Sequence, residues 1–149
     1  MYVDRDSDGK ISGRFSVQQR DGQEYLPDDS TEVTLPDAKS KKREEIQNAF
    51  GLAAAASQLV EGVTYRGGLD AAMRMDFDIR IAEKAGKTKV ILMDTDDAEH
   101  DLLLADANTV LTALGQKTKA NHVKKRGLLR AIENAPNETA LNAIKWGLM

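Results

Sequence analysis

The chain has 149 residues, of which 41% are apolar and 30% charged, and it carries a net charge of −3. This balance is typical of a folded globular protein and argues against disorder throughout. Cysteine is absent and histidine occurs only twice, which excludes disulfides, thiolate zinc sites and thiol nucleophiles. The longest apolar run, residues 49–56, is far shorter than the roughly 20 residues that cross a bilayer, so we expect a cytosolic protein with no membrane partner.

The charges are unevenly distributed along the chain. Residues 1–37 hold nine acids and four bases, whereas residues 38–149 hold fifteen acids and seventeen bases. We therefore predict two parts, a β-rich acidic arm over residues 1–37 and a mainly helical α+β domain over residues 38–149. The expected fold class is α+β, in which a small N-terminal β-meander is followed by a helical domain with short β-hairpins.

The acidic arm has the pattern of short strands joined by tight turns. β-prone runs at residues 2–3, 10–17 and 24–26 are separated by two Asp-Gly pairs, and Asp-Gly between such runs favours a hairpin. Pro27 lacks the N–H that a sheet ladder needs, so strand pairing should stop there. The mostly polar residues 28–42, which include a second proline at position 36, are interpreted as a linker.

The first helix is predicted over the alanine-rich residues 41–61 and should end at Gly62. A strand at residues 63–65 then leads into the glycine pair 67–68. The second helix should begin with Asp70 as its N-cap and stop at Gly86. Its core face is expected to be the apolar row with a four-residue spacing, which consists of Met73, Phe77 and Ile81.

The end of the chain is predicted to contain a hairpin and further helices. The runs 89–93 and 101–104 flank an acidic turn. Residues 90–93 and 102–104 within them are continuously apolar, so these strands should be covered on both faces or be short and edge-protected. A helix should begin at Asp106 and break near Gly127, before a final helix that follows residues 136–137. The inward residues expected on these helices are Val110, Leu111, Leu114, Leu141, Ile144 and Trp146.

One segment of the acidic arm has the pattern of a calcium loop. Asp4, Asp6 and Asp8 alternate before a glycine, as in loops whose carboxylates supply hard oxygen ligands, and the Lys10 carbonyl would be the next ligand. Phe15 stands where such a loop needs a bidentate glutamate. A hairpin tip uses the same residue types because the turn favours them, so calcium and a plain turn are both kept as readings.

A basic stripe lies between residues 116 and 132, where six bases occur without an acid. Such a stripe can contact nucleic-acid phosphates. The segment has no aromatic residue to stack on bases, and the sequence pI is about 5.4, so a solvated helix face or a contact with an acidic protein surface is the favoured reading. The bases are Lys117, Lys119, Lys124, Lys125, Arg126 and Arg130.

The order of motifs over residues 40–147 resembles a known family. Its carriers are residues 62–68, the paired runs 90–97 and 101–104, and residues 128–132 leading to 143–146. In this order they resemble domain-of-unknown-function family 4376, which is found in tail-fibre and tail-associated proteins of tailed bacteriophages. The resemblance implies a small α+β module and brings no catalytic residue.

A second resemblance lies in the acidic arm. Tyr25, Pro27, Asp28 and Asp29, followed by a Glu-Val pair, are similar to a signature near the start of phage tail-fibre and tail-fibre-assembly proteins, which implies a partner-binding segment. Together the resemblances imply a non-enzymatic structural or adaptor protein of the virion tail, made in the host cytoplasm, that binds tail-fibre or baseplate proteins or copies of itself. The alternatives are a tail-fibre assembly chaperone and a nucleic-acid-binding regulator. No cofactor is expected apart from calcium under the first reading of the aspartate loop.

Overall fold

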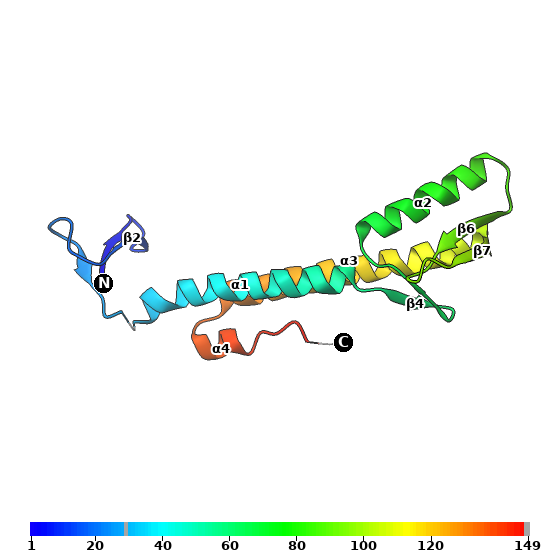
Figure 1. The fold of residues 1–149 in the computed structure, drawn as a ribbon. Helices are drawn as coiled ribbons and strands as arrows, with labels where there is room; N and C mark the ends of the chain where they lie inside the picture. Colours follow the sequence, from blue (N-terminus) through cyan, green and yellow to red (C-terminus); the bar gives the residue numbers. More distant parts are fainter. Residues whose placement is uncertain (29, 148–149) are drawn as a thin grey trace. The chain divides into compact units, whose positions relative to one another are not determined.

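The computed structural model describes residues 1–28 and 30–147. For Val33 it describes only the backbone. The fold is mixed α+β, as predicted: a small antiparallel sheet is followed by helices and short hairpins (Figure 1). Contacts divide the chain into two units, Met1–Glu45 with Leu129–Met149, and Ile46–Leu128. The long helices α1 (Thr31–Ala55) and α3 (Leu104–Asn134) each contribute residues to both units, so the predicted boundary after residue 37 falls inside α1.

The N-terminal sheet contains β1 (Tyr2–Arg5), β2 (Ile11–Phe15) and β3 (Glu24–Tyr25). Its strand order is β2-β1-β3, with both neighbours antiparallel to β1. The predicted meander is therefore wrong in its order, because residues 16–23 cross to the far edge of β1 instead of forming a hairpin. The central position of β1 explains why Val3 is fully buried.

Helix α1 replaces the predicted linker and includes Pro36. Proline lacks one N–H, and so near the helix start it removes only the bond to the carbonyl of Glu32. Within the first unit, Lys39 of α1 donates a 2.8 Å hydrogen bond to the Glu133 carbonyl near the end of α3, and Arg43 forms an ion pair with the Glu133 carboxylate. The sequence pattern did not predict this part of α1 as helix, because the helix is supported by packing against α3, which is distant in sequence.

A hairpin follows α1 where the sequence predicted the last turn of a helix. Strands β4 (Gln58–Val60) and β5 (Val63–Tyr65) pair in antiparallel register. The two residues between them, Glu61 and Gly62, have φ angles of 52° and 83°. Positive φ at both positions is the requirement of the tight turns that match strand twist, so Gly62 closes a hairpin and not a helix.

Helix α2 (Leu69–Lys84) is bounded by glycines. Gly68, with a φ of 96°, is its N-cap, so the prediction of Asp70 as the cap is wrong and Asp70 lies in the first turn, where a carboxylate favours the helix dipole. At the other end the prediction is confirmed, because Gly86 has a φ of 65°. The N–H groups of Gly86 and Lys87 donate to the Glu83 and Ala82 carbonyls, each at 3.0 Å, which is the Schellman arrangement.

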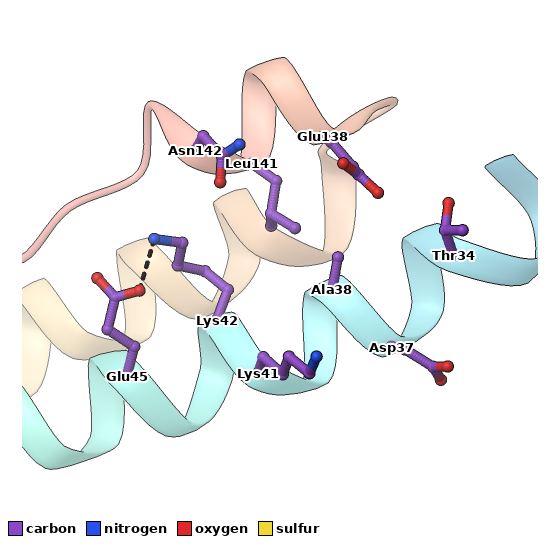
Figure 2. Close-up of a pocket in the computed structure, with 9 residues that line it drawn as sticks. All are labelled: Thr34, Asp37, Ala38, Lys41, Lys42, Glu45, Glu138, Leu141 and Asn142. Atoms are coloured by element: carbon purple, nitrogen blue, oxygen red, sulfur yellow. Dashed lines mark hydrogen bonds and ion pairs between the residues drawn. The ribbon is translucent and has the colours of Figure 1, made fainter. Parts of the chain in front are cut away.

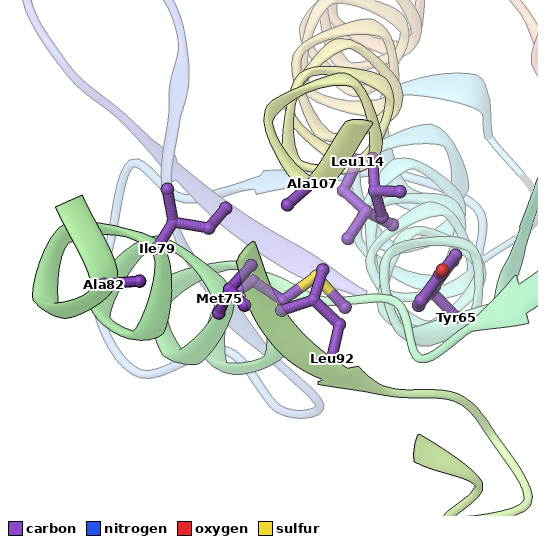
Figure 3. Packing of buried hydrophobic residues seen from close by; sticks show 9 residues of the cluster. Tyr65, Met75, Ile79, Ala82, Leu92, Ala107 and Leu114 are labelled. Atoms are coloured by element: carbon purple, nitrogen blue, oxygen red, sulfur yellow. The ribbon is translucent and has the colours of Figure 1, made fainter. Parts of the chain in front are cut away.

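The predicted second hairpin is confirmed as β6 (Lys89–Met93) and β7 (Glu99–Leu103). It buries only one face in the described part of the chain, because Val90 and Leu92 are buried whereas Ile91 and Met93 are exposed. The core of the second unit joins this face to α2 and α3 (Figure 3). Its buried members are Tyr65, Met75, Ile79, Ala82, Val90, Leu92, Ala107, Val110 and Leu114.

The predicted core face of α2 is wrong, since Met73, Phe77 and Ile81 are exposed and Met75 and Ile79 are buried in their place. The helix carries two apolar rows on opposite sides, and spacing alone does not tell which one faces the core. For α3, the expectation that Val110 and Leu114 point inward is confirmed, and Leu111 packs against the core half-buried.

Helix α3 runs through both Asp106 and Gly127, so the predicted start and break are wrong. A single glycine inside a helix costs about 1 kcal/mol relative to alanine, which packing along a long helix offsets. The last helix, α4 (Glu138–Asn142), is short, and Asn137 caps it by accepting from the Ala140 N–H at 2.9 Å. Leu141 is buried as predicted, whereas Ile144 and Trp146 lie beyond the helix and are half-buried.

Candidate protein-docking surface

The most distinctive surface feature of the second unit is an apolar row along α2. Leu69, Met73, Phe77 and Ile81 are each more than half exposed and follow one another at four-residue steps, which places them side by side on a helix. The buried Met75 and Ile79 lie on the opposite side of the same helix. Exposed apolar patches of this kind on soluble proteins usually mark contacts with other molecules.

Charged side chains border this α2 row on both sides. Asp76 and Arg80 form an ion pair of 2.8 Å on one side, and by helical geometry Asp70 and Arg74 lie on the other. An apolar centre with a charged border is the usual anatomy of a protein interface, in which the centre supplies binding energy and the border supplies orientation.

The outer face of the β6–β7 hairpin is partly apolar, since three apolar residues share it with Lys89, Glu99 and Asp101. Ile91, Met93 and Leu103 are exposed there, and the only ion pair among the described residues of this face joins Lys89 to Asp101 at 2.8 Å. Two cavities lie where α2 and β6 come together, with volumes of about 520 Å³ and 460 Å³. Asp78 lines both cavities, so they form adjoining parts of one groove.

The acidic turn between β6 and β7 is organised by Asp94. Its Oδ1 accepts the N–H groups of Asp96 and Ala98 at 2.8 and 2.9 Å, and its Oδ2 lies 2.9 Å from His100 Nε2. The hydrogen bond with His100, followed by that from Ala98, holds the pKa of Asp94 below its usual range. The acidic residues here build the turn.

Tyr65 connects this turn to the core. Its ring meets the His100 ring edge-on, with centroids 6.1 Å apart, and its burial raises the pKa of the phenol. Beside it, Arg66 holds the tip of the turn through a 2.7 Å ion pair with Asp97. The tip of the hairpin is thus fastened to β5 and to the segment that follows β5.

The structure does not bring Asp4, Asp6 and Asp8 together as a set of metal ligands. Asp6 Oδ1 instead accepts the N–H groups of Asp8 and Lys10, each at 2.9 Å, which is the local bonding of an aspartate turn. The Asp4 carboxylate forms a 2.7 Å ion pair with Arg20. Within the described residues, no three His, Cys, Asp or Glu side chains are grouped as a metal ion would need.

The predicted partner-binding segment lies in the first unit. Tyr25 is exposed and its ring meets that of Tyr2 edge-on at 5.3 Å. The exposed Pro27 accepts the Ser30 N–H at 3.0 Å through its carbonyl, and the Asp28 carboxylate lies 2.7 Å from the amino group of Met1. Asp29 lies outside the described residues. Tyr25 and Pro27 therefore remain accessible to a partner.

Two members of the basic stripe are used inside the second unit. Lys117 donates to the carbonyls of Ala56 and Ser57 just after α1, each at 2.9 Å, which satisfies groups that a helix end leaves unpaired. Lys125 lies 4.5 Å from the centre of the Phe50 ring. The stripe thus serves partly to attach α3 to α1.

The first unit has its own cavity of about 460 Å³ between α1 and α4 (Figure 2). Leu141 of α4 is buried against α1 there, and Lys42 forms a 2.6 Å ion pair with Glu45 on α1. The charges in its lining are of both signs and include Asp37, Lys41 and Glu138. This lining has the character of a packing groove between two helices.

Comparison of the chain with protein-family models, curated proteins and solved structures gives no match. The resemblances to phage tail proteins therefore stay predictions. Among the helices that the structure describes, none has an apolar stretch long enough to span a membrane. The sequence analysis recognised the four-residue spacing of the exposed apolar row on α2 but assigned that row to the core, so it did not identify it as a surface feature.

Proposed function

We propose that this protein is a non-enzymatic bacteriophage tail component that acts as a structural adaptor through protein–protein contacts. The observation that carries the proposal is the exposed row of Leu69, Met73, Phe77 and Ile81 on α2. Covering these side chains removes apolar surface from water, which favours association by about 25 cal/mol for each Å². The assignment of the partner as a tail-fibre or baseplate protein rests on the two sequence resemblances.

The geometry of the row supports a contact with a helix or a flat apolar surface. Rows of residues spaced four apart form the ridges that fit into the grooves of a neighbouring helix in the commonest class of helix packing. The charged border of Arg74 and Asp76 would then set the orientation of the partner. The row lies on the helix face opposite the core, so a partner could cover it without disturbing Met75 or Ile79.

The test uses virions of a phage whose genome encodes this chain. Mass spectrometry of purified particles should detect the protein, and cross-linking should join it to a fibre or baseplate protein. Particles are then made with Phe77→Asp and, as a control, Leu52→Asp, which places the same charge at an exposed apolar position on α1. We expect Phe77→Asp to remove the protein from the tail and Leu52→Asp to leave it in place.

Two outcomes would count against the adaptor proposal. Absence of the wild-type protein from purified virions would exclude a permanent tail component. If the fibre also fails to trimerise without this chain, the result would point to the assembly chaperone. We do not propose a nucleic-acid regulator, because Lys117 and Lys125 are engaged within the second unit.

A further inference from the structure

The backbone of β6 has an unpaired edge, and the hydrogen bonds at both ends of the hairpin identify it. The Asp94 N–H donates to the Ala98 carbonyl and the Leu104 N–H donates to the Thr88 carbonyl, each at 3.1 Å. Both bonds continue the β6–β7 register. Because hydrogen-bonded pairs alternate along an antiparallel ladder, the even-numbered residues of β6 bond to β7 and the odd-numbered residues point away from it.

Lys89, Ile91 and Met93 therefore direct their N–H and C=O groups away from β7. In the part of the chain that the structure describes, no hydrogen bond uses these groups. Natural proteins protect such an edge with charges, proline or a bulge in the strand itself, or by covering it with a helix or loop. Within β6 itself the protection is one lysine at the start, and the four residues that follow are apolar.

There is space beside this edge. The two cavities along α2 and β6 have Ile91 and Met93 in their linings, and their other wall is formed by α2, including Arg74 and Asp78. One backbone hydrogen bond among the described residues joins this side of the hairpin to β5, where the Thr95 N–H just after β6 donates to the Thr64 carbonyl at 2.9 Å. After β5 the glycine pair turns the chain into α2, and among the strands that the structure describes none other than β7 pairs with β6.

We propose that β6 binds an extended segment of a partner protein as an added strand, in the groove between β6 and α2. This inference rests on the proposed function, because it names how a partner is held. An extended segment fits because its own N–H and C=O groups alternate with the spacing of the unpaired groups on β6. A helix has no such groups to offer, since its backbone is bonded internally.

The side chains of the groove define the kind of segment that it accepts. On the outer face, apolar residues of the added strand would lie beside Ile91 and Met93, where cross-strand neighbours are about 5 Å apart. On the α2 side, the added strand would face Asp70, Arg74 and Asp78, which suit polar or oppositely charged side chains. The expected occupant is an extended segment with apolar and polar residues in alternation, and α2 beside the groove favours a single chain over a second copy of the hairpin.

The experiment uses the purified full-length chain and short peptides selected from a random displayed library by binding to it. Hydrogen–deuterium exchange should show that the peptides protect the amides of Ile91 and Met93, while the amides of Val90 and Leu92 are protected in the free and bound chain alike. This readout needs no variant. The selected peptides should show alternation of apolar and polar residues.

A matched pair of variants tests the role of the backbone donor. Ile91→Pro removes an N–H that β7 does not use, and edge strands tolerate proline at such positions, whereas Ile91→Ala keeps the N–H and loses the side chain. Ile91→Pro should weaken peptide binding about tenfold more than Ile91→Ala. Circular dichroism of both variants should match the wild type, and if Ile91→Pro unfolds, Met93→Pro against Met93→Ala provides the same comparison.

Any of four results would overturn the inference. Three of them are protection confined to α2, equal binding by the proline and alanine variants, and failure of the library to give any binder. Concentration-dependent self-association that protects Ile91 and Met93 would assign the edge to a second copy and would also overturn it. The assay uses no virion, so it can fail while the protein is found in the tail, and it can succeed while the protein is absent from the tail.

Discussion

Asp94 and His100 face each other across the end of the β6–β7 hairpin, with Asp94 Oδ2 2.9 Å from His100 Nε2. Both side chains are partly shielded from solvent, and Asp94 also accepts the N–H groups of Asp96 and Ala98. One carboxylate thus holds both sides of the turn. The order of the turn depends on that carboxylate being ionised.

The first prediction concerns acid sensitivity. The folded-state pKa of Asp94 is lowered, first by the hydrogen bond with His100 and next by the Ala98 N–H, so its contribution is present above the unfolded pKa of about 3.9 and is lost as the pH falls through the folded pKa. The protection factor of the Ala98 amide, which is its exchange rate compared with the intrinsic rate at the same pH, should fall on acidification below about pH 5. Asp94→Asn should flatten this pH dependence, whereas Asp96→Asn should retain it. An unchanged pH profile in Asp94→Asn would contradict the assignment.

The second prediction concerns calcium at the N-terminal loop. Because Asp4 is paired with Arg20 and Asp6 is bonded to backbone N–H groups, millimolar calcium should leave the thermal unfolding temperature as it is in chelator. Asp6→Asn and Asp8→Asn should show the same indifference. A rise in the unfolding temperature with calcium that disappears in Asp6→Asn would instead establish a calcium loop, since binding to the folded state stabilises by mass action.

The third prediction distinguishes the two apolar rows of α2. Ile79→Ala should lower the free energy of unfolding by about 2–5 kcal/mol, because it leaves a cavity among buried neighbours. Phe77→Ala should change it by less than about 0.5 kcal/mol, because Phe77 is exposed. Urea unfolding of both variants provides the measurement. A larger loss for Phe77→Ala would mean that the predicted core face was right and the observed one wrong.

The fourth prediction compares two glycines. A Cβ at Gly67 would overlap the Ala56 carbonyl oxygen, which is a backbone atom, whereas a Cβ at Gly127 would meet nothing within 4 Å. Gly67→Ala should therefore destabilise by about 1–3 kcal/mol, and Gly127→Ala in the middle of α3 should stabilise by about 1 kcal/mol. The unfolding temperatures of the two variants, compared with that of the wild type, provide the measurement. Equal effects would show that the approach of Ala56 to Gly67 is not fixed in solution.

Local signals in the sequence predicted those elements whose geometry is set by neighbouring residues. Gly86 marks the end of α2 because only a residue that tolerates positive φ completes that motif, and the apolar runs on either side of the acidic turn mark β6 and β7. Local signals did not predict the elements whose structure depends on contacts between residues distant in sequence. Pro36 was predicted to lie in a linker and Gly127 to break a helix, but each lies in a long helix that packing supports.

The candidate site was harder to predict than the fold. The row that contains Met73 and Phe77 and the row that contains Met75 and Ile79 have similar spacing and composition, and the choice between them is made by the strands and α3, which offer only one apolar face to α2. The unpaired edge of β6 depends on where β5 ends and where α2 begins, and no local sequence pattern predicts it. Tyr25 and Pro27, which were identified from a resemblance, are exposed but belong to the other unit.

The two apolar rows of α2 also bear on how long the protein survives in the cell. The inward row is buried as soon as the chain folds, whereas under the proposed function the outward row stays in contact with water until a partner covers it. Molecules made in excess of the partner would keep that row exposed and be open to aggregation and proteolysis. We therefore expect the steady amount of this protein to follow the supply of its partner, so that the stoichiometry of the assembly is set by clearance of the surplus.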